Sequence, residues 1–408
     1  VYLQTAAPFC AVCIGVQGAG KSHTMNVILE NCMLPTYSNR REITTNIQPM
    51  TGLVLHYDQS ESNVCEAVGL YQSNRILSSI EPSMKVQRMV VLVSPNYYHQ
   101  RKAFYEEKCE VYPLLFNWSH LTATHLRKLM RLTESDSQLY VSVMLNKLQT
   151  YQRNNEIPVF EEFVKDIQSA CNASGQSAPL QQRLELLKNF MRDSELNKNL
   201  KGYSLDSTDI LAPGTLVVAD LTDPMLAADE ACGVFQVLLE QFRCAQLKGV
   251  GKVITFDEAH KYLNHKGPGC IELTNSIIET IRMMRHEGIR VLLSTQSPTT
   301  MPPELLELAS LTILHKFQSS EWVKYISSKV PLPEDGFNRI KSLAPGQALL
   351  ISTHIGSNFT QNTSTNTTEN TKIKERKGQV NCLTVNIRPR LTQDLGASKY
   401  NTSSSSIV

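Results

Sequence analysis

The sequence predicts an α/β fold, a mostly parallel sheet with helices on both faces, interrupted by an all-helical insertion. Two observations predict it. Short apolar runs alternate along most of the 408 residues with longer segments of helical spacing, which is the pattern of strands joined by covering helices. Between about residues 121 and 200 the apolar positions recur at helical spacing alone, so this stretch is expected to be an insertion into the α/β core.

Composition places few limits on function. The 408 residues can hold one large domain with insertions or two domains, and a hydrophobic fraction of 41% is enough for a packed core. A formal net charge of +2 neither requires nor excludes nucleic acid, because a channel can be basic while the outer surface offsets it. Ten cysteines without a signal sequence favour a cytoplasmic or nuclear protein with reduced thiols. No apolar run approaches the about 20 residues that cross a bilayer, so we expect no membrane partner.

The first expected elements are a strand from Phe9 to Ile14 and a helix from Ser22 to Asn31. Strands follow from Gly52 to His56 and from Met89 to Val93, with a helical candidate from Val64 to Leu77 between them. The first strand contains a Cys-x-x-Cys without a second pair at zinc spacing. We therefore expect those two cysteines to be small core residues.

The helical insertion is expected to carry several helices. Two of them, Phe160 to Cys171 and Leu180 to Phe190, are punctuated by prolines. A small basic face is formed by Arg127, Lys128 and Arg131, which we interpret as a solvated helix surface. Nothing in the insertion identifies a ligand.

The α/β alternation then resumes. Its expected strands are Gly214 to Ala219, Lys252 to Phe256, Gly288 to Ser294, Leu311 to Lys316 and Gln347 to Ser352, and its helices are Asp229 to Arg243 and Ile271 to Arg285. An Asn/Thr/Ser-rich stretch from Ser357 to Thr371 predicts a mobile loop, and a short strand from Cys382 to Ile387 is expected to return to the core. The expected organisation is therefore a core at 1–100 and 206–356, the insertion at 101–205, a disordered loop at 357–381 and a short strand with a flexible tail at 382–408.

A glycine-rich segment joins the first strand to the first helix. It reads Gly15-Val-Gln-Gly-Ala-Gly-Lys21-Ser22, which matches Gly-x-x-x-x-Gly-Lys-Ser/Thr in the strand–loop–helix context that this pattern needs. Glycines let backbone N–H groups close around phosphate oxygens, and the helix adds the positive end of its dipole. Lys21 would reach the β- and γ-phosphates, and the Ser22 hydroxyl would hold Mg²⁺. We predict a site for ATP and Mg²⁺ whose nucleotide-binding residues are Gly15, Gln17, Gly18, Ala19, Gly20, Lys21, Ser22 and His23.

A second apolar strand ends in two acids, Asp257 and Glu258. In an open parallel sheet, ligands gather at the carboxyl ends of strands, where the glycine-rich loop also lies. Asp257 is expected to hold Mg²⁺ through water, and Glu258 to orient and deprotonate the water that attacks the γ-phosphate. The adjacent glutamate favours hydrolysis over transfer of the phosphoryl group to a second substrate.

The letters Asp-Glu-Ala-His at 257–260 also suggest a DEAH-box RNA helicase, an interpretation that we reject. That family places its acidic motif much closer to the phosphate loop. It also needs a second motor domain with a Gln/Gly/Arg-rich motif, which this sequence lacks. His260 is expected to begin a helix rather than to take part in catalysis.

A third polar segment, Thr295-Gln296-Ser-Pro298, follows another apolar strand and should lie beside the first two strand ends. Gln296 is expected to contact the γ-phosphate or the attacking water, which would let the protein distinguish ATP from ADP. The other interpretation, a polar strand end before a proline turn, stays open.

Together these segments resemble the HerA/FtsK superfamily of P-loop ATPases, most closely its HerA branch. Two further segments carry the resemblance, Leu211 to Thr222 and Ile387-Arg-Pro-Arg-Leu-Thr392. It spans most of the chain except the helical insertion and the tail. The motifs are specific as an ordered set, although each is short.

The resemblance implies a RecA-like P-loop NTPase core assembled as a hexameric ring, with ATP between subunits. It further implies a central channel that pumps double-stranded DNA, alongside a partner nuclease in end processing. In that family an arginine completes the neighbouring subunit's site. Arg285, three residues before Gly288, matches its position best, with Arg282 as substitute, and such an arginine is worth about 10³–10⁵ in turnover.

The sequence also departs from the family. It enters its first core strand almost at once, so we expect the small β-barrel that precedes the motor in bacterial and archaeal members to be absent. Because that barrel helps to hold the ring together, its absence puts hexamer formation by this chain alone in doubt. The second hypothesis is therefore a nucleotide-switched binding module that moves no polymer. A degraded ATPase kept for its structure is the third, and the intact Lys21, Ser22, Asp257 and Glu258 argue against it.

Overall fold

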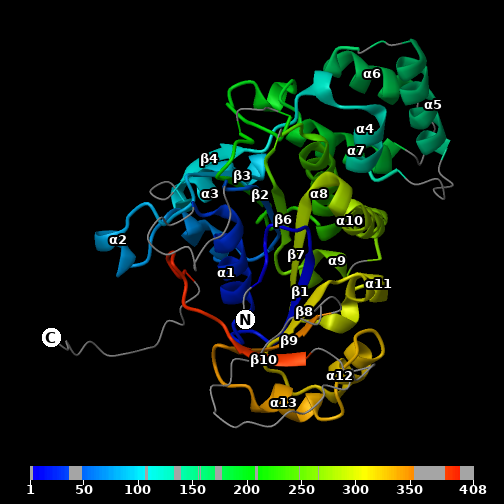
Figure 1. Cartoon of the computed structure of the whole chain (residues 1–408). Helices are drawn as coiled ribbons and strands as arrows, with labels where there is room; N and C mark the ends of the chain where they lie inside the picture. Colours follow the sequence, from blue (N-terminus) through cyan, green and yellow to red (C-terminus); the bar gives the residue numbers. More distant parts are fainter. Residues whose placement is uncertain are drawn as a thin grey trace, which may run out of the picture.

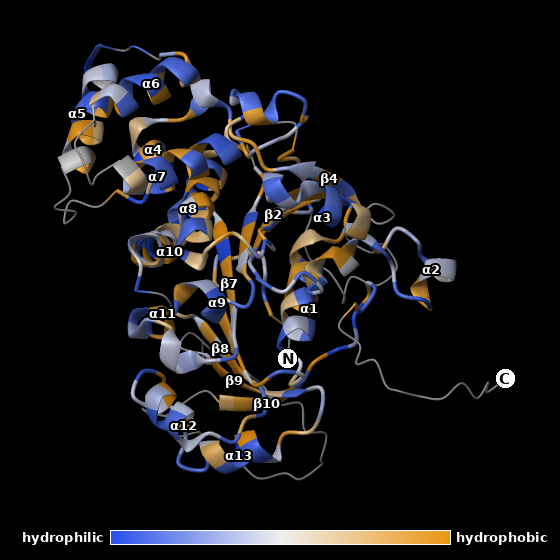
Figure 2. Ribbon diagram, turned by 180° about the vertical axis from the view of Figure 1, so that it is seen from behind, coloured by the Kyte–Doolittle hydropathy of each residue, from blue (hydrophilic) through white to orange (hydrophobic). Residues whose placement is uncertain are grey.

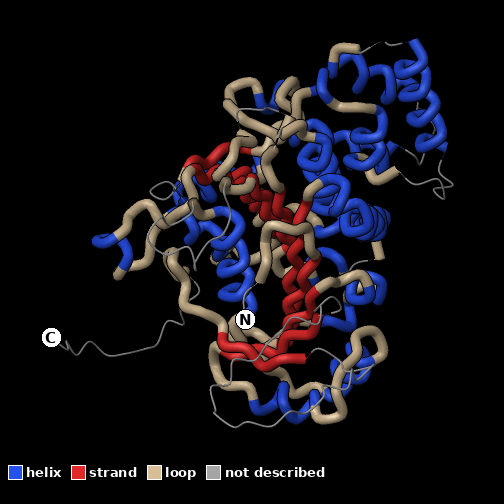
Figure 3. The backbone as a smooth tube through the Cα atoms, in the orientation of Figure 1, coloured by secondary structure: helices blue, strands red, loops and turns tan. Residues whose placement is uncertain are grey.

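The computed structural model describes residues 3–35, 48–105, 109–132, 139–154, 156, 158–170, 177–206, 210–247, 249–264, 266–352 and 382–395. Its centre is a ten-stranded sheet in the order β10-β9-β8-β1-β7-β6-β2-β5-β3-β4 (Figures 1 and 3). The strands are β1 (Cys10–Ile14), β2 (Thr51–His56), β3 (Arg88–Val93), β4 (Glu110–Pro113), β5 (Thr215–Asp220), β6 (Lys252–Phe256), β7 (Ile289–Thr295), β8 (Leu311–Leu314), β9 (Gln347–Ser352) and β10 (Cys382–Asn386).

Helices cover both faces of this sheet. The α-helices are α1 (Lys21–Met33), α2 (Leu77–Ile80), α3 (Tyr98–Tyr105), α4 (Ala123–Leu129), α5 (Leu139–Asn154), α6 (Phe160–Ala170), α7 (Ser177–Phe190), α8 (Ala228–Cys244), α9 (His260–Leu263), α10 (Pro268–Glu287), α11 (Pro303–Glu307), α12 (Ser320–Ser327) and α13 (Gly336–Ser342). Short 3₁₀ segments are η1 (Glu66–Tyr71), η2 (Pro95–Tyr97), η3 (Trp118–His120), η4 (Glu195–Asn197) and η5 (Pro298–Thr300).

The strand pairing explains the apolar runs in the sequence. From β8 across to β4 every neighbouring pair is parallel, while β9 runs antiparallel to both β8 and β10. A parallel sheet covered on both faces has apolar residues at every position of its strands, and β1 is buried throughout. Its side chains alternate between two core layers, one against α1 and α3 and the other against α8 and α10. In Figure 2 the strands are mostly hydrophobic, and the helices on either side of them mix hydrophilic and hydrophobic residues.

The all-helical insertion, α4 to α7, lies at one end of the sheet (Figure 1). It joins the core through α4, which packs on α8. The structure corrects the interpretation of its basic face as a solvated surface. Lys128 forms an ion pair with Glu240, and Arg131 Nη1 lies 3.0 Å from Asp229 Oδ2. These cations fasten the insertion to α8 because they neutralise acids on that helix.

One expected element differs from the structure. The sequence predicts a helix from Val64 to Leu77, but this stretch holds η1 and then irregular chain before α2. Its backbone pairs instead with residues far along the chain. Gln393 N donates to Gln72 O at 2.8 Å, and Asn74 N donates to Leu391 O at 2.9 Å. Those hydrogen bonds replace the i to i−4 ladder of a helix, and no local pattern in the sequence signals them.

The segment that follows β10 lies across α1 and fixes it. Glu30 is fully buried, and its Oε1 accepts hydrogen bonds from the backbone N–H groups of Leu391 and Thr392 at 2.9 and 2.8 Å. Its other carboxylate oxygen pairs with Arg388 Nη1 at 2.6 Å. The helix that follows the glycine-rich loop is therefore tied to residues more than 350 positions away in the sequence.

The remaining expected elements are present, with ends within about three residues of those predicted. The short β4, α3 and α11 to α13 were not expected. The Asn/Thr/Ser-rich stretch at 357–371 and the tail after 395 lie outside the described residues. Among the described helices, none has the length and apolar character to cross a membrane.

Candidate nucleotide site at the carboxyl ends of the central strands

The glycine-rich loop turns between β1 and α1 in a conformation that its glycines permit. Gly18 and Gly20 have φ values of 74° and 99°, in the left-handed region that side chains rarely adopt. At Gly15 a Cβ would lie 2.7 Å from the Cβ of His315, so only glycine fits there. No side chain caps the start of α1, so the N–H groups of its first turn and the positive end of its dipole face the loop. This is an anion site.

Lys21, the first residue of α1, is only 4% exposed, and its Nζ donates to Val16 O at 3.1 Å. Burial lowers its pKa, while the negative charges of Glu258 and Asp257 act in the opposite direction. The lysine and the two acids therefore share one electrostatic environment, although 236 positions separate Lys21 from Asp257 (257 − 21).

The other predicted nucleotide-binding residues follow the same loop. Gln17 and Gly18 are exposed, whereas Ala19, Gly20 and Ser22 are half-buried. The His23 imidazole Nε2 lies 2.9 Å from the backbone oxygen of Arg388, so this side chain is directed to the segment across α1. His23 remains a predicted nucleotide contact through its backbone N–H rather than through its ring.

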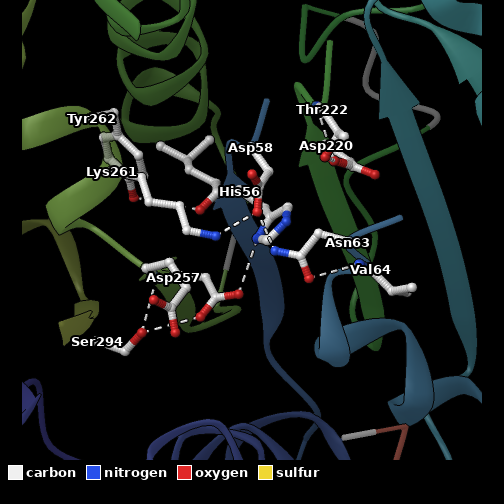
Figure 4. Close-up of polar contacts among 12 residues, drawn as sticks. His56, Asp58, Asn63, Val64, Asp220, Thr222, Asp257, Lys261, Tyr262 and Ser294 are labelled. Carbon is white, nitrogen blue, oxygen red and sulfur yellow. Dashed lines mark hydrogen bonds and ion pairs between the residues drawn. The ribbon is translucent and has the colours of Figure 1, made fainter. Parts of the chain in front are cut away.

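Asp257 follows β6 and is held by two neighbouring strands (Figure 4). Ser294 Oγ donates to its Oδ1 at 3.1 Å, and His56 Nδ1 lies 3.1 Å from its Oδ2. Burial by itself raises the pKa of this carboxyl. The hydrogen bond from His56 and its charge outweigh that effect, so the pKa of Asp257 is lowered. The side chain is an ionised carboxylate of fixed orientation.

Glu258 adopts a left-handed backbone conformation with φ 48°. Its N–H donates to Ser294 Oγ at 3.0 Å, and its Oε2 accepts a 2.7 Å hydrogen bond from Gln296 Nε2. Burial and the nearby charge of Asp257 raise the pKa of Glu258. The Ser294 hydroxyl thus binds both acids, to Glu258 as acceptor and to Asp257 as donor.

The sheet order accounts for the position of Gln296. Because β7 lies between β1 and β6, its carboxyl end falls between the glycine-rich loop and the acids. Gln296 N also donates to His260 Nδ1 at 3.3 Å. Burial lowers the pKa of His260 to about 4, so this imidazole is neutral. His260 is the first residue of α9, as its position in the sequence predicts.

Four residues around this site were not singled out from the sequence. Ser294 and His56 fix Asp257, as described above. His315 follows β8, packs beneath Gly15 and bonds Thr24 Oγ1 at 3.0 Å through Nε2. Glu66 lies in η1, where burial and then the charge of Asp257 raise its pKa to about 7. Ser294, His56 and His315 are polar residues at the ends of apolar strands, and this position is the one sequence signal that could have found them. Glu66 carries no such signal.

The predicted trans arginine lies elsewhere. Arg285 is exposed in the last turn of α10, just before the amino end of β7, whereas Gln296 follows the carboxyl end of that strand. Arg282 is also exposed and pairs with Glu304. Neither arginine forms a contact with Asp257 or Glu258 of its own chain.

The oxygen ligands suit Mg²⁺. The Ser22 hydroxyl at the start of α1 and the ionised Asp257 carboxylate are hard oxygen donors, which Mg²⁺ takes together with waters and phosphate oxygens. Ser22 and Asp257 are therefore the residues that would hold this ion.

No family model matches the sequence, and no curated protein matches it. Solved structures do. The chain is similar to the genome packaging NTPase B204 from Sulfolobus turreted icosahedral virus 2 in complex with ATP-gammaS, with 12% identity, a TM-score of 0.35, and 86% of this chain and 93% of that chain covered. It is also similar to VirB4 of Thermoanaerobacter pseudethanolicus, with 13% identity, a TM-score of 0.44 and coverages of 84% and 86%.

A third similar structure is the plasmid coupling protein TrwB in complex with ADP and Mg²⁺, with 10% identity, a TM-score of 0.45 and coverages of 85% and 87%. At these identities and TM-scores the likenesses assign neither a family nor an activity to this chain. The fold assignment rests on the glycine-rich loop, the acids that follow β6 and the strand order. With these features the chain has the fold expected of a P-loop NTPase.

Proposed function

We propose that this chain is a Mg²⁺-dependent ATPase of the HerA-like branch, a motor that translocates or processes double-stranded DNA. The observation that carries the proposal is the arrangement around Glu258. Its carboxylate accepts a 2.7 Å hydrogen bond from Gln296 and interacts electrostatically with the buried Lys21. A carboxylate that can activate water, next to a lysine that binds phosphate, is what hydrolysis of a terminal phosphate requires.

Each residue has a role in this mechanism. Lys21 and the N–H groups at the start of α1 bind and orient the triphosphate. Ser22 and Asp257 would hold Mg²⁺, which supplies charge neutralisation at the β- and γ-phosphate oxygens. Glu258 orients the attacking water and takes its proton, and its raised pKa improves its match to a base working near neutral pH. Gln296 holds Glu258 and is placed to exchange that bond for one to the γ-phosphate or the water.

The first test is ATP turnover by the whole chain. Lys21→Ala should abolish hydrolysis because it removes the phosphate-binding cation. Glu258→Gln should still bind ATP but should hydrolyse it about 10²–10⁴-fold more slowly, because only the water-activating group is lost. Glu334→Gln, a change at an exposed loop residue, is the matched control and should keep full activity. Equal turnover by Glu258→Gln and the unmodified chain would contradict the mechanism.

The second test concerns DNA. Duplex DNA should stimulate turnover, and its binding should weaken steeply with added salt, since a motor that tracks phosphates releases counterions when it binds. ATP binding without any DNA affinity at low salt would instead favour the nucleotide-switched binding module.

The resemblance also supports an assembly. In a hexameric ring the exposed Arg285 would reach the site of a neighbouring subunit. This fits its position before the amino end of β7, at the opposite end of that strand from Gln296. A partner nuclease would then act on the DNA that the ring moves. Measuring the mass of the purified chain with and without ATP and duplex DNA tests the assembly.

A further inference from the structure

Three side chains of metal-binding type meet around Asp257, one of the acids of the nucleotide site. His56 is the last residue of β2, Cys65 immediately precedes η1, and Asp257 follows β6, the strand paired with β2. One ligand atom from each, namely an imidazole nitrogen, the thiol sulfur and a carboxylate oxygen, lies within 4.8 Å of the other two. Among the described residues this is the one such group. Figure 4 shows His56 and Asp257 facing each other across the gap between the two strand ends.

The group is buried and its hydrogen bonding is incomplete. His56 is 1% exposed and Cys65 is fully buried, while 15% of the Asp257 side chain remains exposed. His56 bonds Asp257 through Nδ1, but its Nε2 has no hydrogen-bond partner. A buried imidazole nitrogen is normally paired, so this unpaired nitrogen is available to a ligand. Asp257 is the most exposed of the three side chains.

The donor set discriminates between metals. Imidazole, thiolate and carboxylate are the ligands of Zn²⁺, at metal–ligand distances of about 2.0–2.3 Å, whereas Mg²⁺ takes oxygen ligands. Three protein ligands around a tetrahedral ion leave a fourth position for water. In that geometry ligand atoms are about 3.3–3.8 Å apart, so small side-chain rotations bring these three into range.

We propose that His56, Cys65 and Asp257 form a Zn²⁺ site that shares Asp257 with the Mg²⁺ site. When Zn²⁺ binds, the Cys65 thiol and the protonated His56 imidazole each release one proton to solvent, and the sulfur and a ring nitrogen bond the ion. The hydrogen bond between His56 and Asp257 is replaced by bonds from a nitrogen of one and an oxygen of the other to Zn²⁺. Asp257 then no longer serves Mg²⁺, so Zn²⁺ inhibits hydrolysis. This last consequence rests on the proposed function, whereas the site itself does not.

The site is tested with Co²⁺ alone, a spectroscopic substitute for Zn²⁺, added to the full chain without nucleotide or Mg²⁺. A thiolate-to-cobalt charge-transfer band should appear and saturate at one equivalent. Cys65→Ala should lose the band, and its affinity should fall by more than about 100-fold, the upper end of the loss when an outer-shell partner is removed. Cys32→Ala removes an equally buried thiol outside the group and should keep the band.

A second variant guards against a folding defect. His56→Asn can still donate a hydrogen bond to Asp257 through its side-chain amide, but it offers no imidazole nitrogen. It should bind Co²⁺ at least about 10-fold more weakly while keeping the melting temperature within a few degrees of the unmodified chain. No band in the unmodified chain, or the same band in Cys65→Ala, would overturn the proposal.

The inhibition is tested separately. Zn²⁺ should suppress ATP turnover reversibly, with recovery on adding a chelator, and Cys65→Ala should need about 100-fold more Zn²⁺ for the same effect. Equal Zn²⁺ sensitivity in Cys65→Ala would overturn the link to catalysis. If the chain hydrolyses no ATP under any condition, the proposed function fails, while the Co²⁺ titration still decides the metal site.

Discussion

Ser294→Ala is the substitution that most directly tests how Asp257 and Glu258, the proposed catalytic acids, are held. The Ser294 hydroxyl accepts the Glu258 N–H at 3.0 Å and donates to Asp257 Oδ1 at 3.1 Å. Both bonds disappear in the variant, and alanine fits the space without a clash. The change therefore leaves Lys21 and the glycine-rich loop untouched while it releases both acids.

The magnitude follows from those two bonds. Loss of a hydrogen bond to a carboxylate costs about 1.5–3 kcal/mol, and a buried N–H left unpaired costs about 1–3 kcal/mol. Part of each loss is recovered because the 15% exposed Asp257 can bind water. We expect the free energy of unfolding to fall by about 2–5 kcal/mol. Because Glu258 has a φ of 48°, it should relax toward an ordinary conformation, and misplacement by about 1 Å lowers kcat by about 10²-fold.

Urea unfolding and steady-state ATP hydrolysis measure the two effects. The KM for ATP should change much less than kcat, since the phosphate-binding residues keep their positions. Ser276→Ala is the matched control, because that exposed hydroxyl donates to Glu272 O on the surface of α10. Its loss should lower the free energy of unfolding by less than about 0.5 kcal/mol. If Ser294→Ala were as stable and as active as Ser276→Ala, the hydroxyl would not position the acids.

Three further predictions concern two buried histidines, the glycine-rich loop and Arg285. Burial lowers the pKa values of His260 and His315 to about 4 from 6.5, so the unfolded chain binds more protons between those values. Above pH 6.5 the two histidines do not reduce the free energy of unfolding. Between pH 6.5 and pH 4 that free energy falls by about 1.4 kcal/mol per pH unit for each histidine. In His315→Gln, urea denaturation at several pH values in this range should show a smaller fall per pH unit. Gly15→Ala places a Cβ 2.7 Å from His315 Cβ and should weaken ATP binding in equilibrium titration by about 1–3 kcal/mol, with recovery in the double variant with His315→Gly. Arg285→Ala and Lys21→Ala should each be inactive, yet an equimolar mixture should regain activity at about a quarter of the interfaces of a randomly mixed ring; a mixture that stays inactive would contradict a trans arginine.

The sequence predicts the parts of this molecule whose chemistry is local. The glycine-rich loop, the acids after β6 and most strands can be predicted because each depends on residues that are neighbours in the sequence. Ser294, His56 and His315 escape such reasoning because their roles come from strands that are adjacent in the sheet but distant in the chain. The roles expected for Lys21, Glu258 and Gln296 stay predictions until activity is measured.

The expected helix at 64–77 is wrong for the same physical reason. Its backbone forms hydrogen bonds with residues 391 and 393 in place of the helical i to i−4 bonds. The same stretch holds Glu66, whose pKa is raised by burial and by the charge of Asp257, and the expected helix gave no sign of that carboxyl.

Because the buried Glu30 carboxylate is paired by residues 388, 391 and 392, the packing of α1 depends on residues that are synthesised much later. The partners of Glu30, at positions 388, 391 and 392, leave the ribosome long after α1 does. Until they arrive, α1 carries a charge that cannot be buried without a large penalty, so the helix that presents Lys21 cannot settle against the sheet. A nascent chain halted before residue 388 should therefore remain susceptible to proteases at α1, and competence to bind ATP would be acquired only after residues 388–392 have emerged.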